Sequence, residues 1–566
     1  MKNLFQKQGL NFALLGLATL PTALQAKDTK EQKPNVLFIA VDDLKPVLGC
    51  YGTPIIKTPN IDRLANQGTV FLNNYVQQAI SGATRASCLT GMRPDYTQVW
   101  DLVTRMRDMN PDIITIPQYF ISQGYTTAGV GKIFHPSCVE NLDQPSWSIP
   151  YLTTEDYYPS DLGQPVQKAY QSQKTKDLVK KYRKEAEDKG LTKKEITSYI
   201  TKHIKPSIEC VDVPDNAYED GTIALAAKDQ LKKFAKSGQP FFFAVGFHKP
   251  HLPFVSPKKY WDLYNRKDMP VAEFQEHAKN SPDIAYHRSG ELKQYTDIPE
   301  LCTFTDQQSK TGLNIDKQRE LIHGYYAAVS YTDAQVGILL NTLESLGMLN
   351  NTIIVLWGDH GWHLGDHDLW CKHTNFENAT HSPLIISGPG IKPGKTKSMT
   401  EFVDIFPTLC DLAGIPIPTQ LDGTSLVPVM KDVNKQVKEY AVSQYPRNLK
   451  NGDIKKLGLE SGDVMGYSLR TLRYRYTVWM DNSFRSNSAF DEAKVYATEL
   501  YDYEKDPLEK VNVVNSREYA SVSKDMKSKL LIFFKSQEKI GPYINGVHHK
   551  SSKKKLKLKI EDNAEE

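Results

Sequence analysis

Asn35-Val-Leu-Phe-Ile-Ala-Val41, followed at once by Asp42-Asp43, is the stretch that decides the fold of this chain. A mostly apolar run without polar alternation is typical of a strand that is buried on both faces of a parallel sheet. The acidic pair marks the point where that strand ends. The stretch therefore predicts an inner strand with further layers of the protein packed against both of its faces.

Three further apolar runs end in polar residues in the same way, at residues 126–130, 241–246 and 352–357. Helical patterns lie between or beside these runs, at residues 61–68, 116–124, 222–236 and 321–346. Strands that alternate with helices indicate an open α/β sheet. We therefore predict an α/β fold with a large, mostly parallel central sheet flanked by helices.

The pattern changes toward the C-terminus. Residues 467–479 alternate like a half-buried strand, and residues 526–535 have a helical pattern. We predict a smaller C-terminal subdomain, residues 441–548, in which an antiparallel sheet packs on a helix. The main domain then covers residues 27–440, and the basic and then acidic tail, residues 549–566, is expected to be disordered.

Two stretches of the main domain differ from the rest in composition. Residues 168–205 are highly charged, with helical patterns on either side of Gly190, and predict a solvated helical insertion. A rim that contacts an anionic polymer is the alternative for this stretch. Residues 256–305 are rich in turn residues and predict a long surface connection.

The first 26 residues have the layout of a secretory signal peptide. Lys2 and Lys7 precede an apolar run at residues 11–20, and small residues close the segment at Ala26. The run is too short to span a bilayer stably, and we find no later apolar stretch of sufficient length. We expect residues 1–26 to be cleaved and the chain to be exported, to the periplasm or out of the cell.

Composition excludes two classes of protein. The chain carries 70 basic and 66 acidic residues, a net charge of +4, which argues against a broad basic face for nucleic acid. Its seven cysteines include no Cys-x-x-Cys pair, and the odd count leaves at least one thiol free if the others pair. We therefore expect neither a nucleic-acid partner nor a small disulfide scaffold.

Residues that bind metal ions, anions or protons follow the four apolar runs. Ligands of open α/β sheets bind outside the carboxyl ends of the strands. One such strand end alone indicates a solvated loop, but four of them predict a shared site. The residues expected to converge there are Asp42, Asp43, Lys132, His135, His251, Asp359 and His360.

Four of these residues form a candidate metal site. Asp42, Asp43 and Asp359 supply carboxylates, and His360 supplies an imidazole. Oxygen-rich sites favour hard cations, and an exported protein makes Ca²⁺ the expected ion, with Mg²⁺ as the alternative. Clustered carboxylates repel one another unless a cation neutralises them, which favours a metal over carboxylates held by hydrogen bonds alone.

The stretch Ser81-Gly-Ala-Thr-Arg85 places a hydroxyl and a fixed cation one helical turn apart, at the expected start of a helix. Unpaired N–H groups at a helix N-terminus also suit an oxyanion. Ser81 is therefore a candidate nucleophile, and Arg85 is its candidate partner. The alternative is an ordinary N-cap serine.

These segments, in this order, resemble the sulfatase branch of the alkaline-phosphatase superfamily, from residue 35 to residue 512. Within that branch they are most similar to the enzymes that act on iduronate 2-sulfate. The resemblance implies an alkaline-phosphatase-like fold and a sulfuric ester hydrolase. The carrying segments are Val41-Asp-Asp-Leu44, Gln77-Gln-Ala79, Ser81 to Arg85, Gly91-Met-Arg-Pro-Asp95, Gly131-Lys-Ile-Phe-His-Pro136, residues 244–254, residues 358–365, Ser443-Gln-Tyr-Pro-Arg447 and Met465-Gly-Tyr-Ser-Leu-Arg470.

The resemblance implies that Ser81 is oxidised after translation to formylglycine, an aldehyde whose hydrate attacks the sulfate ester. It implies that the cation is held by Asp42, Asp43, Asp359, His360 and the formylglycine made from Ser81.

The remaining catalytic roles also follow from the resemblance. Arg85 and Lys132 hold the formylglycine hydroxyls. His251 and Lys372 bind the sulfate, and one of them protonates the departing sugar oxygen. His135 removes the proton of the second hydroxyl, which releases sulfate and restores the aldehyde. Residues expected to line the substrate site are His248, Trp362, His363 and His373, with Arg447 and Arg470 as contacts for a sugar carboxylate.

Two departures from the family pattern have consequences. The commoner Cys-x-Pro-x-Arg is replaced by Ser81-x-Ala83-x-Arg85, so the partner enzyme that makes formylglycine should be the bacterial kind that accepts serine and works without oxygen. The charged insertion at residues 168–205 has no counterpart in the branch that acts on iduronate.

The resemblance favours one function and leaves two alternatives. The favoured function is removal of a 2-O-sulfate from a hexuronate of a sulfated oligosaccharide, during degradation of a glycosaminoglycan or another polysaccharide. The first alternative is a phosphodiesterase or phosphonate monoester hydrolase of the same superfamily, and the second is an inactive carbohydrate-binding relative.

Overall fold

The computed structural model describes residues 33–287, 289–299, 313–449, 463–481 and 490–540, together with positions 452 and 455. The expected signal peptide, the expected disordered tail and Cys302 lie outside these residues. Within the described part of the chain, no helix is both long enough and apolar enough to cross a membrane. All six cysteines of this part are free thiols.

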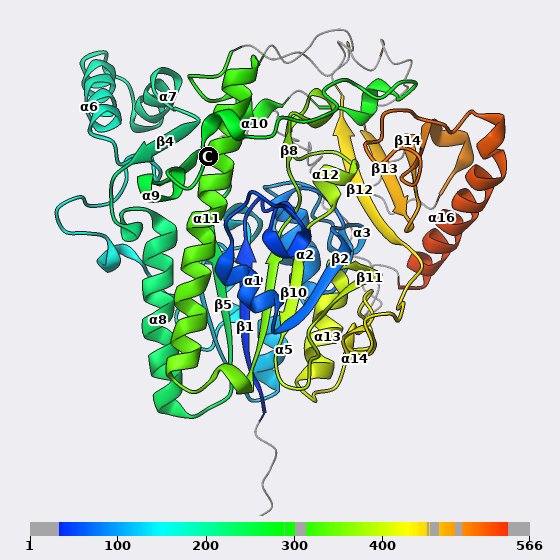
Figure 1. Cartoon of the computed structure of the whole chain (residues 1–566), viewed down its shortest axis with the longest axis horizontal. Helices are drawn as coiled ribbons and strands as arrows, with labels where there is room; N and C mark the ends of the chain where they lie inside the picture. Colours follow the sequence, from blue (N-terminus) through cyan, green and yellow to red (C-terminus); the bar gives the residue numbers. More distant parts are fainter. Residues whose placement is uncertain are drawn as a thin grey trace, which may run out of the picture. The chain divides into compact units, whose positions relative to one another are not determined.

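A seven-stranded sheet forms the centre of the larger, α/β part of the chain (Figure 1). Only the two pairings of β10, with β2 and with β7, are antiparallel; the other neighbours run parallel. The predicted mostly parallel α/β sheet is confirmed. The strands, in order across the sheet, are β11 (Gly394–Glu401), β2 (Gly68–Tyr75), β10 (Leu384–Ser387), β7 (Thr352–Gly358), β1 (Asn35–Val41), β5 (Phe241–Phe247) and β3 (Thr126–Gly131).

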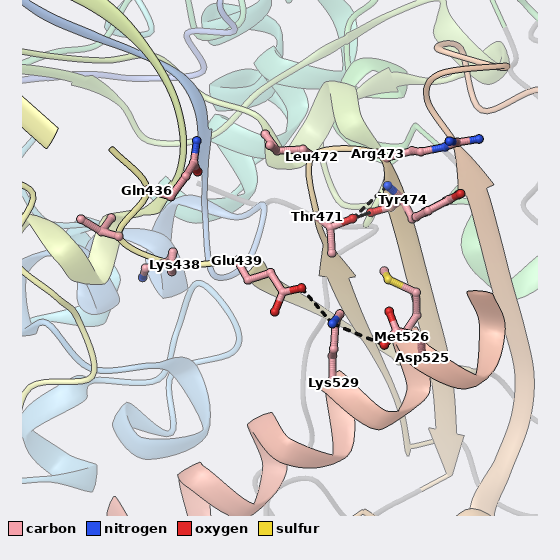
Figure 2. Close-up of a pocket in the computed structure, with 11 residues that line it drawn as sticks. Gln436, Lys438, Glu439, Thr471, Leu472, Arg473, Tyr474, Asp525, Met526 and Lys529 are labelled. Carbon is pink, nitrogen blue, oxygen red and sulfur yellow. Dashed lines mark hydrogen bonds and ion pairs between the residues drawn. The ribbon is translucent and has the colours of Figure 1, made fainter. Parts of the chain in front are cut away.

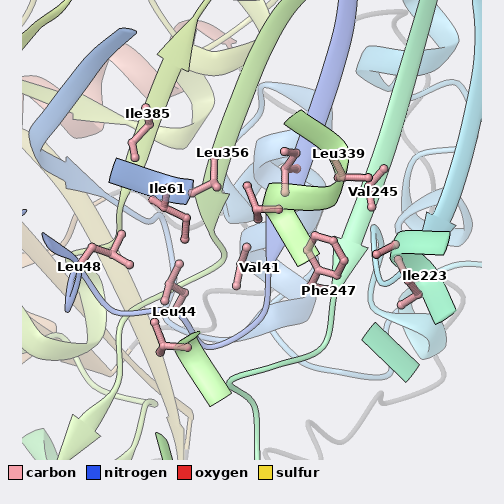
Figure 3. Packing of buried hydrophobic residues seen from close by; sticks show 14 of the residues in the cluster. Val41, Leu44, Leu48, Ile61, Ile223, Val245, Phe247, Leu339, Leu356 and Ile385 are labelled. Carbon is pink, nitrogen blue, oxygen red and sulfur yellow. The ribbon is translucent and has the colours of Figure 1, made fainter. Parts of the chain in front are cut away.

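Side chains of β1 alternate between two cores, one on each face of the sheet. Leu37, Ile39 and Val41 enter the first core, where each fully buried aliphatic side chain contributes about 1.5–3 kcal/mol. Figure 3 shows this core around Val41. The helices that cover it are α1 (Pro59–Ala65), α8 (Glu219–Ser237) and α11 (Ile315–Ser345).

The other face of β1 carries Val36, Phe38 and Ala40, which enter the second core. Burial on both faces explains why every position from Val36 to Val41 is apolar. The helices that cover this face are α2 (Ser81–Thr90), α5 (Ile116–Ser122) and α13 (Ile405–Leu412).

The four helices and four strands of the prediction are present, and their ends differ for local reasons. α11 begins six residues before the predicted helix because the Asn314 side chain caps it, accepting from the Lys317 N–H at 2.8 Å. α1 stops before Gly68, where β2 begins. A Cβ on Gly68 would lie 2.4 Å from the Ile386 carbonyl oxygen of β10, so this strand pairing requires glycine.

The C-terminal sheet is antiparallel throughout and packs on the long helix α16 (Ala520–Ile540), as predicted (Figure 1). The single strand expected at residues 467–479 is wrong. A turn closed by the Thr471 N–H, which donates to the Tyr474 carbonyl at 2.8 Å, divides it into two strands. The strands, in order, are β12 (Ala441–Asn448), β13 (Asp463–Arg470), β14 (Tyr474–Asp481) and β15 (Val495–Asp502).

The charged stretch holds two helices, α6 (Gln173–Asp188) and α7 (Lys193–His203), joined through Gly190 in a left-handed conformation. The pair leads to a short parallel sheet of β4 (Ile208–Val211) and β6 (Phe254–Pro257). Solvent reaches most charged side chains of both helices.

A buried acid in the C-terminal sheet predicts a pH-dependent stability. Glu499 accepts hydrogen bonds from Trp479 Nε1 and from the Tyr501 hydroxyl, each at 2.7 Å. Burial raises the pKa of Glu499 to about 7, so the folded chain holds this proton more tightly than the unfolded chain. Protonated Glu499 therefore adds about 3 kcal/mol to the free energy of unfolding. This contribution is complete below about pH 4.5 and is lost as the pH rises through about 7.

The variant Glu499→Gln cannot ionise at this position. Its melting temperature should fall less than that of the wild type between about pH 5 and about pH 8. The matched control is Glu504→Gln, at a side chain that is 66% exposed, and it should follow the wild type. Equal slopes for the wild type and Glu499→Gln in thermal unfolding would contradict the prediction.

Candidate active site

The polar residues at the strand ends meet at one edge of the seven-stranded sheet. β1 lies between β5 and β7 and runs parallel to both, so the carboxyl ends of the three strands are neighbours. Asp42 and Asp43 follow β1, and Asp359 follows β7. The Asp43 N–H donates to Asp359 Oδ1 at 2.9 Å, and the Asp359 N–H donates to the Val41 carbonyl at 3.1 Å. The two strand ends are therefore locked together.

Ser81 begins α2, and its side chain faces these carboxylates. Ser81 Oγ lies 3.3 Å from Asp42 Oδ1 and 3.2 Å from His360 Nε2. Ile80, not Ser81, is the N-cap residue, and the cap position makes no side-chain hydrogen bond. The alternative of an ordinary N-cap serine is therefore wrong.

Close packing fixes the first turn of α2. A Cβ on Gly82 would lie 2.3 Å from the Asp101 carbonyl oxygen and 2.8 Å from Cys138 Sγ, and both distances are shorter than real Cβ contacts. A glycine directly after Ser81 lets the neighbouring segment approach and hold the helix start in place.

Arg85 lies one turn after Ser81, on the same face of α2. Its Nη2 donates to Asp42 Oδ1 at 2.9 Å, and its Nε donates to Asp359 Oδ2 at 3.0 Å. Nη1 donates to the carbonyl oxygens of Lys132 and Ile133, at 2.5 and 3.0 Å. The guanidinium is fully buried, so this single side chain ties three segments of the site together.

Two overlapping sets of side chains have the spacing of a metal site. The ligand atoms of Asp43, Asp359 and His360 lie within 4.8 Å of one another, and so do those of Asp42, Asp43 and His251. His360 Nδ1 lies 3.0 Å from the Gly361 carbonyl and therefore carries a hydrogen, which leaves Nε2 as the coordinating nitrogen.

The two adjacent aspartates differ in their electrostatics. Burial alone would raise the pKa of Asp42, but Lys132 and Arg85 hold it well below its usual value. Lys132 Nζ lies 2.5 Å from Asp42 Oδ2. Burial raises the pKa of Asp43 well above its usual value, because Lys372 offsets only part of that cost and Asp42 adds repulsion. Additional positive charge at Asp43 would therefore be stabilising.

His135 provides a neutral imidazole beside this cluster. Burial, and then the charge of Lys132, lowers the pKa of His135 to about 3. The ring is therefore uncharged at neutral pH and is able to accept a proton.

Lys372 and His251 both lie beside the Asp43 carboxylate. Lys372 Nζ donates to both carboxylate oxygens of Asp43, at 3.1 Å each. His251 Nε2 lies 3.7 Å from Asp43 Oδ2, and 29% of its side chain is exposed.

Glu291 completes this part of the site, although no sequence pattern marks it. It lies in the short helix α10 (Gly290–Lys293), 2.8 Å from Lys372 Nζ through Oε2 and 3.1 Å from His251 Nε2 through Oε1. The surface connection expected at residues 256–305 is therefore wrong in part, because this stretch also enters the site.

Unusual backbone conformations flank the site residues. Asp43, Cys371 and His373 have φ angles of 56°, 82° and 67°, in the left-handed region that non-glycine residues seldom occupy. Strain of this kind persists only where the surrounding structure imposes it, and it concentrates at functional sites. Lys372 lies between two such residues.

The expected substrate-wall residues fall into two groups. Trp362 and His363 are buried, with the Trp362 ring 4.7 Å from Lys372 Nζ and His363 Nε2 2.9 Å from Thr374 Oγ1. These two side chains therefore pack against other residues of the site, and their contact with substrate stays a prediction. His248 and His373 keep part of their surface exposed, so their contact with substrate stays a prediction.

Arg447 and Arg470 have internal partners, and their expected contact with a sugar carboxylate stays a prediction. The Arg447 guanidinium donates to the backbone carbonyls of Ile284, Ala285 and His373, at 2.9 to 3.1 Å. Arg470 Nε donates to Glu377 Oε2 at 3.0 Å. Both arginines lie in the C-terminal sheet, and each is 7% exposed. Their hydrogen bonds connect this sheet to segments outside it.

A cavity of about 680 Å³ lies elsewhere, beside the C-terminal sheet (Figure 2). It is lined by residues 436–439, the turn between β13 and β14 and side chains of α16, among them Lys529, which pairs with Glu439 at 2.8 Å. None of the candidate site residues lines it. The candidate active site is filled by its own ion pairs instead.

Comparisons with known proteins agree with this geometry. The Sulfatase family model matches residues 34–415. Human (Homo sapiens) iduronate 2-sulfatase is 34% identical, over 90% of this chain and 96% of that protein. The phosphonate monoester hydrolase of Agrobacterium radiobacter has a similar fold, with a TM-score of 0.63 and 23% identity over 89% of this chain and 96% of that one. A 2-O GAG sulfatase structure gives a TM-score of 0.56 and 22% identity, over 89% and 92% of the two chains.

The two solved structures support the alkaline-phosphatase-like fold, and the sequence matches identify the family. The family model covers well over half of the chain, and the match to the human enzyme extends over nearly all of it. The chain therefore belongs to the sulfatase family and is a sulfuric ester hydrolase.

Proposed function

We propose that this sulfatase removes the 2-O-sulfate of a hexuronate from a sulfated oligosaccharide, during degradation of a glycosaminoglycan or a related polysaccharide. The support is 34% identity, over nearly the full length of both chains, to a protein named iduronate 2-sulfatase. The reaction would use a formylglycine made from Ser81 and a divalent cation.

One observation supports the proposed mechanism most directly. Ser81 is the first residue of α2, and its Oγ lies 3.3 Å from Asp42 Oδ1 and 3.2 Å from His360 Nε2, beside the buried Arg85. A sulfate monoester resists hydrolysis because its anionic oxygens repel nucleophiles, so catalysis needs positive charge and an aligned nucleophile. The N-terminus of α2, Arg85 and Lys132 supply positive charge at this position. Matured Ser81 would supply an aldehyde whose hydrate is the nucleophile.

The side chains around Ser81 suit a hard divalent cation. Three of the four donors are carboxylates, and such an oxygen-rich set favours Ca²⁺, with Mg²⁺ as the second choice. When bound, the cation would neutralise charge on the sulfate oxygens. The residues that would hold it are Asp42, Asp43, Asp359, His360 and matured Ser81.

The cationic side chains of the chain itself orient the reacting groups. Arg85 fixes Asp42 and Asp359 through its planar guanidinium, which is suited to several hydrogen bonds at once. Lys132 holds the second oxygen of Asp42. Both cations would also orient the modified side chain at position 81.

Lys372 and His251 would have different roles toward the substrate, with Lys372 binding the sulfate and His251 donating a proton. Burial alone would lower the pKa of Lys372, but Asp43 and Glu291 raise it above its usual value, so Lys372 stays charged and binds sulfate. Burial lowers the pKa of His251 well below its usual value, so the protonated ring that would donate to the departing sugar oxygen depends on the nearby carboxylates of Asp43 and Glu291. Neutral His135 would accept the proton whose removal releases sulfate.

A second candidate is hydrolysis of a phosphodiester or phosphonate ester by an unmodified Ser81. The distance of 3.2 Å between Ser81 Oγ and His360 Nε2 favours it, because Nε2 is the acceptor nitrogen and would take the hydroxyl proton. His360 Nε2 does not take this proton while it binds a cation. Formylglycine and the plain hydroxyl therefore require different roles of His360.

An assay of substrate classes tests the proposed function. We expect sulfate release from heparin disaccharides with a 2-O-sulfated uronate at the non-reducing end, and slower turnover of 6-O-sulfated glucosamine and of bis(4-nitrophenyl) phosphate. Released sulfate is measured by ion chromatography. Preference for the 6-O-sulfate would refute the proposed sugar, and faster hydrolysis of the phosphodiester would favour the second candidate.

We also propose how the enzyme reaches its active form. Residues 1–26 would direct export, and a maturation enzyme that accepts serine would convert Ser81. The support is the sequence of these two segments, with its basic and apolar leader and its Ser-x-Ala-x-Arg motif. We further propose residues 27–440 as the catalytic domain and residues 441–548 as the C-terminal subdomain.

A further inference from the structure

Glu291 is a charged residue of the site that the proposed mechanism leaves without a role. Its side chain is 10% exposed, and its carboxylate contacts two other charged or chargeable groups. Oε2 lies 2.8 Å from Lys372 Nζ, and Oε1 lies 3.1 Å from His251 Nε2. One carboxylate therefore bridges the two residues proposed to handle the sulfate and the leaving oxygen.

Hydrogen-bond geometry fixes which side of His251 faces Glu291. His251 Nδ1 lies 2.6 Å from the Leu252 carbonyl oxygen. Because a carbonyl only accepts, Nδ1 carries a hydrogen there, and Nε2 is the nitrogen turned toward Glu291. The Leu252 carbonyl thus orients the ring, and the Glu291 carboxylate lies where it would accept from a hydrogen on Nε2, the atom that would deliver a proton to the substrate.

Glu291 also determines the position of Lys372. The ammonium group has Asp43 on one side, Glu291 on another and the Trp362 ring at 4.7 Å. In the proposed function Asp43 also serves the cation, so its charge is shared. Glu291 then remains the dedicated partner of Lys372, and it holds the ammonium group beside the His251 ring.

Glu291 is itself held by its surroundings. Leu292 and Tyr295 are buried beside it in the first core. Just beyond, the Thr296 N–H donates to the Lys205 carbonyl at 2.8 Å, and Asp297 accepts from the Ser207 N–H at 2.7 Å. Hydrogen bonds therefore hold the segment that contains Glu291 against the connection between helix α7 and strand β4.

We propose that Glu291 is a positioning residue, which holds Lys372 Nζ and the His251 ring in the arrangement that binds the sulfate and protonates the leaving oxygen. The proposal rests on the proposed function of that site. Glu291 acts through its two partners and not on the substrate itself.

The variant Glu291→Gln keeps the size of the side chain and removes its charge. With a 2-O-sulfated uronate disaccharide, we expect kcat to fall about 10- to 100-fold. KM should change much less than kcat, because the loss of a negative charge near the anionic substrate offsets the poorer positioning of Lys372. The conservative variant Glu291→Asp should recover part of kcat. A kcat within about twofold of the wild type, or a raised KM with unchanged kcat, would overturn the proposal.

Glu273→Gln is the matched control, because Glu273 is an exposed carboxylate of the same connecting stretch. It should match the wild type in kcat and KM. Crystal structures of the wild type and Glu291→Gln test the positioning without turnover. Displacement of Lys372 Nζ and of the His251 ring supports the proposal, and unmoved side chains contradict it. If the wild type releases no sulfate from any sulfated uronate, the proposed function fails, while this structural comparison still decides the role of Glu291.

Discussion

Replacing Ser81 by alanine is expected to abolish sulfate release while the chain still folds. Alanine cannot be oxidised to an aldehyde, so the proposed nucleophile never forms. The substitution removes only the contacts of Oγ to Asp42 and His360, at a buried helix start whose backbone is fixed by neighbouring segments. We expect kcat/KM to fall by at least about 10⁴-fold, with a melting temperature close to that of the wild type.

Ser87→Ala is the control in the same helix. Ser87 is buried, and its Oγ has no hydrogen-bond partner among the described residues. Kinetics and thermal unfolding of both variants, measured side by side, separate loss of the nucleophile from damage to α2. Activity of Ser81→Ala within about tenfold of the wild type would refute a nucleophilic role for this residue.

The second large effect is expected at the cation site, for Asp359→Asn. Asp359 Oδ2 pairs with Arg85, and Oδ1 accepts from the Asp43 N–H, so asparagine retains the shape but loses one of three negative charges. Weaker cation binding should lower kcat/KM by at least about 100-fold. In the wild type, a chelator should remove activity and lower the melting temperature, and added Ca²⁺ should restore both.

The control for this variant is Asp316→Asn, at an exposed position in the first turn of α11. Thermal unfolding during a Ca²⁺ titration should show a rising melting temperature for the wild type and the control, and a much smaller response for Asp359→Asn. A wild type that keeps its activity and melting temperature after exhaustive treatment with a chelator would contradict a cation site.

Long apolar strands made the centre of this fold predictable. β1, β5 and β7 are buried on both faces, so each strand coincides with an apolar run to within one residue. Their parallel order also explains why Asp42 and Asp359 meet although they lie far apart in the sequence. The strand positions follow from the local apolar pattern. The meeting of the two aspartates follows from the rule that ligands of open α/β sheets bind at the carboxyl ends of the strands.

The other edge of the sheet was not predictable in this way. β11, at the edge of the sheet, has the polar sequence Gly-Lys-Thr-Lys-Ser-Met-Thr-Glu, so no apolar run marks it although much of it is buried. β10 has only four residues and runs against both of its neighbours. Such a strand carries too few residues for a periodic pattern, and its direction depends on the chain that leads into it.

Lys372 and Glu291 are site residues that no local sequence pattern predicts. Lys372 was predicted only through the family resemblance, because a lysine after Trp370-Cys371 has no distinctive pattern. Glu291 lies in a turn-rich stretch, and only tertiary structure brings it to its partners. The sequence also does not reveal that Arg470 pairs with Glu377, because this partner comes from a distant segment.

The mass of the peptide that contains Ser81 decides whether formylglycine is the nucleophile. The protein should be purified from its native host, digested and analysed by mass spectrometry before and after reaction with an aldehyde-specific hydrazide. The formylglycine mechanism predicts a Ser81 peptide that has lost two hydrogens and that forms the hydrazone. An unmodified serine in fully active enzyme would contradict it.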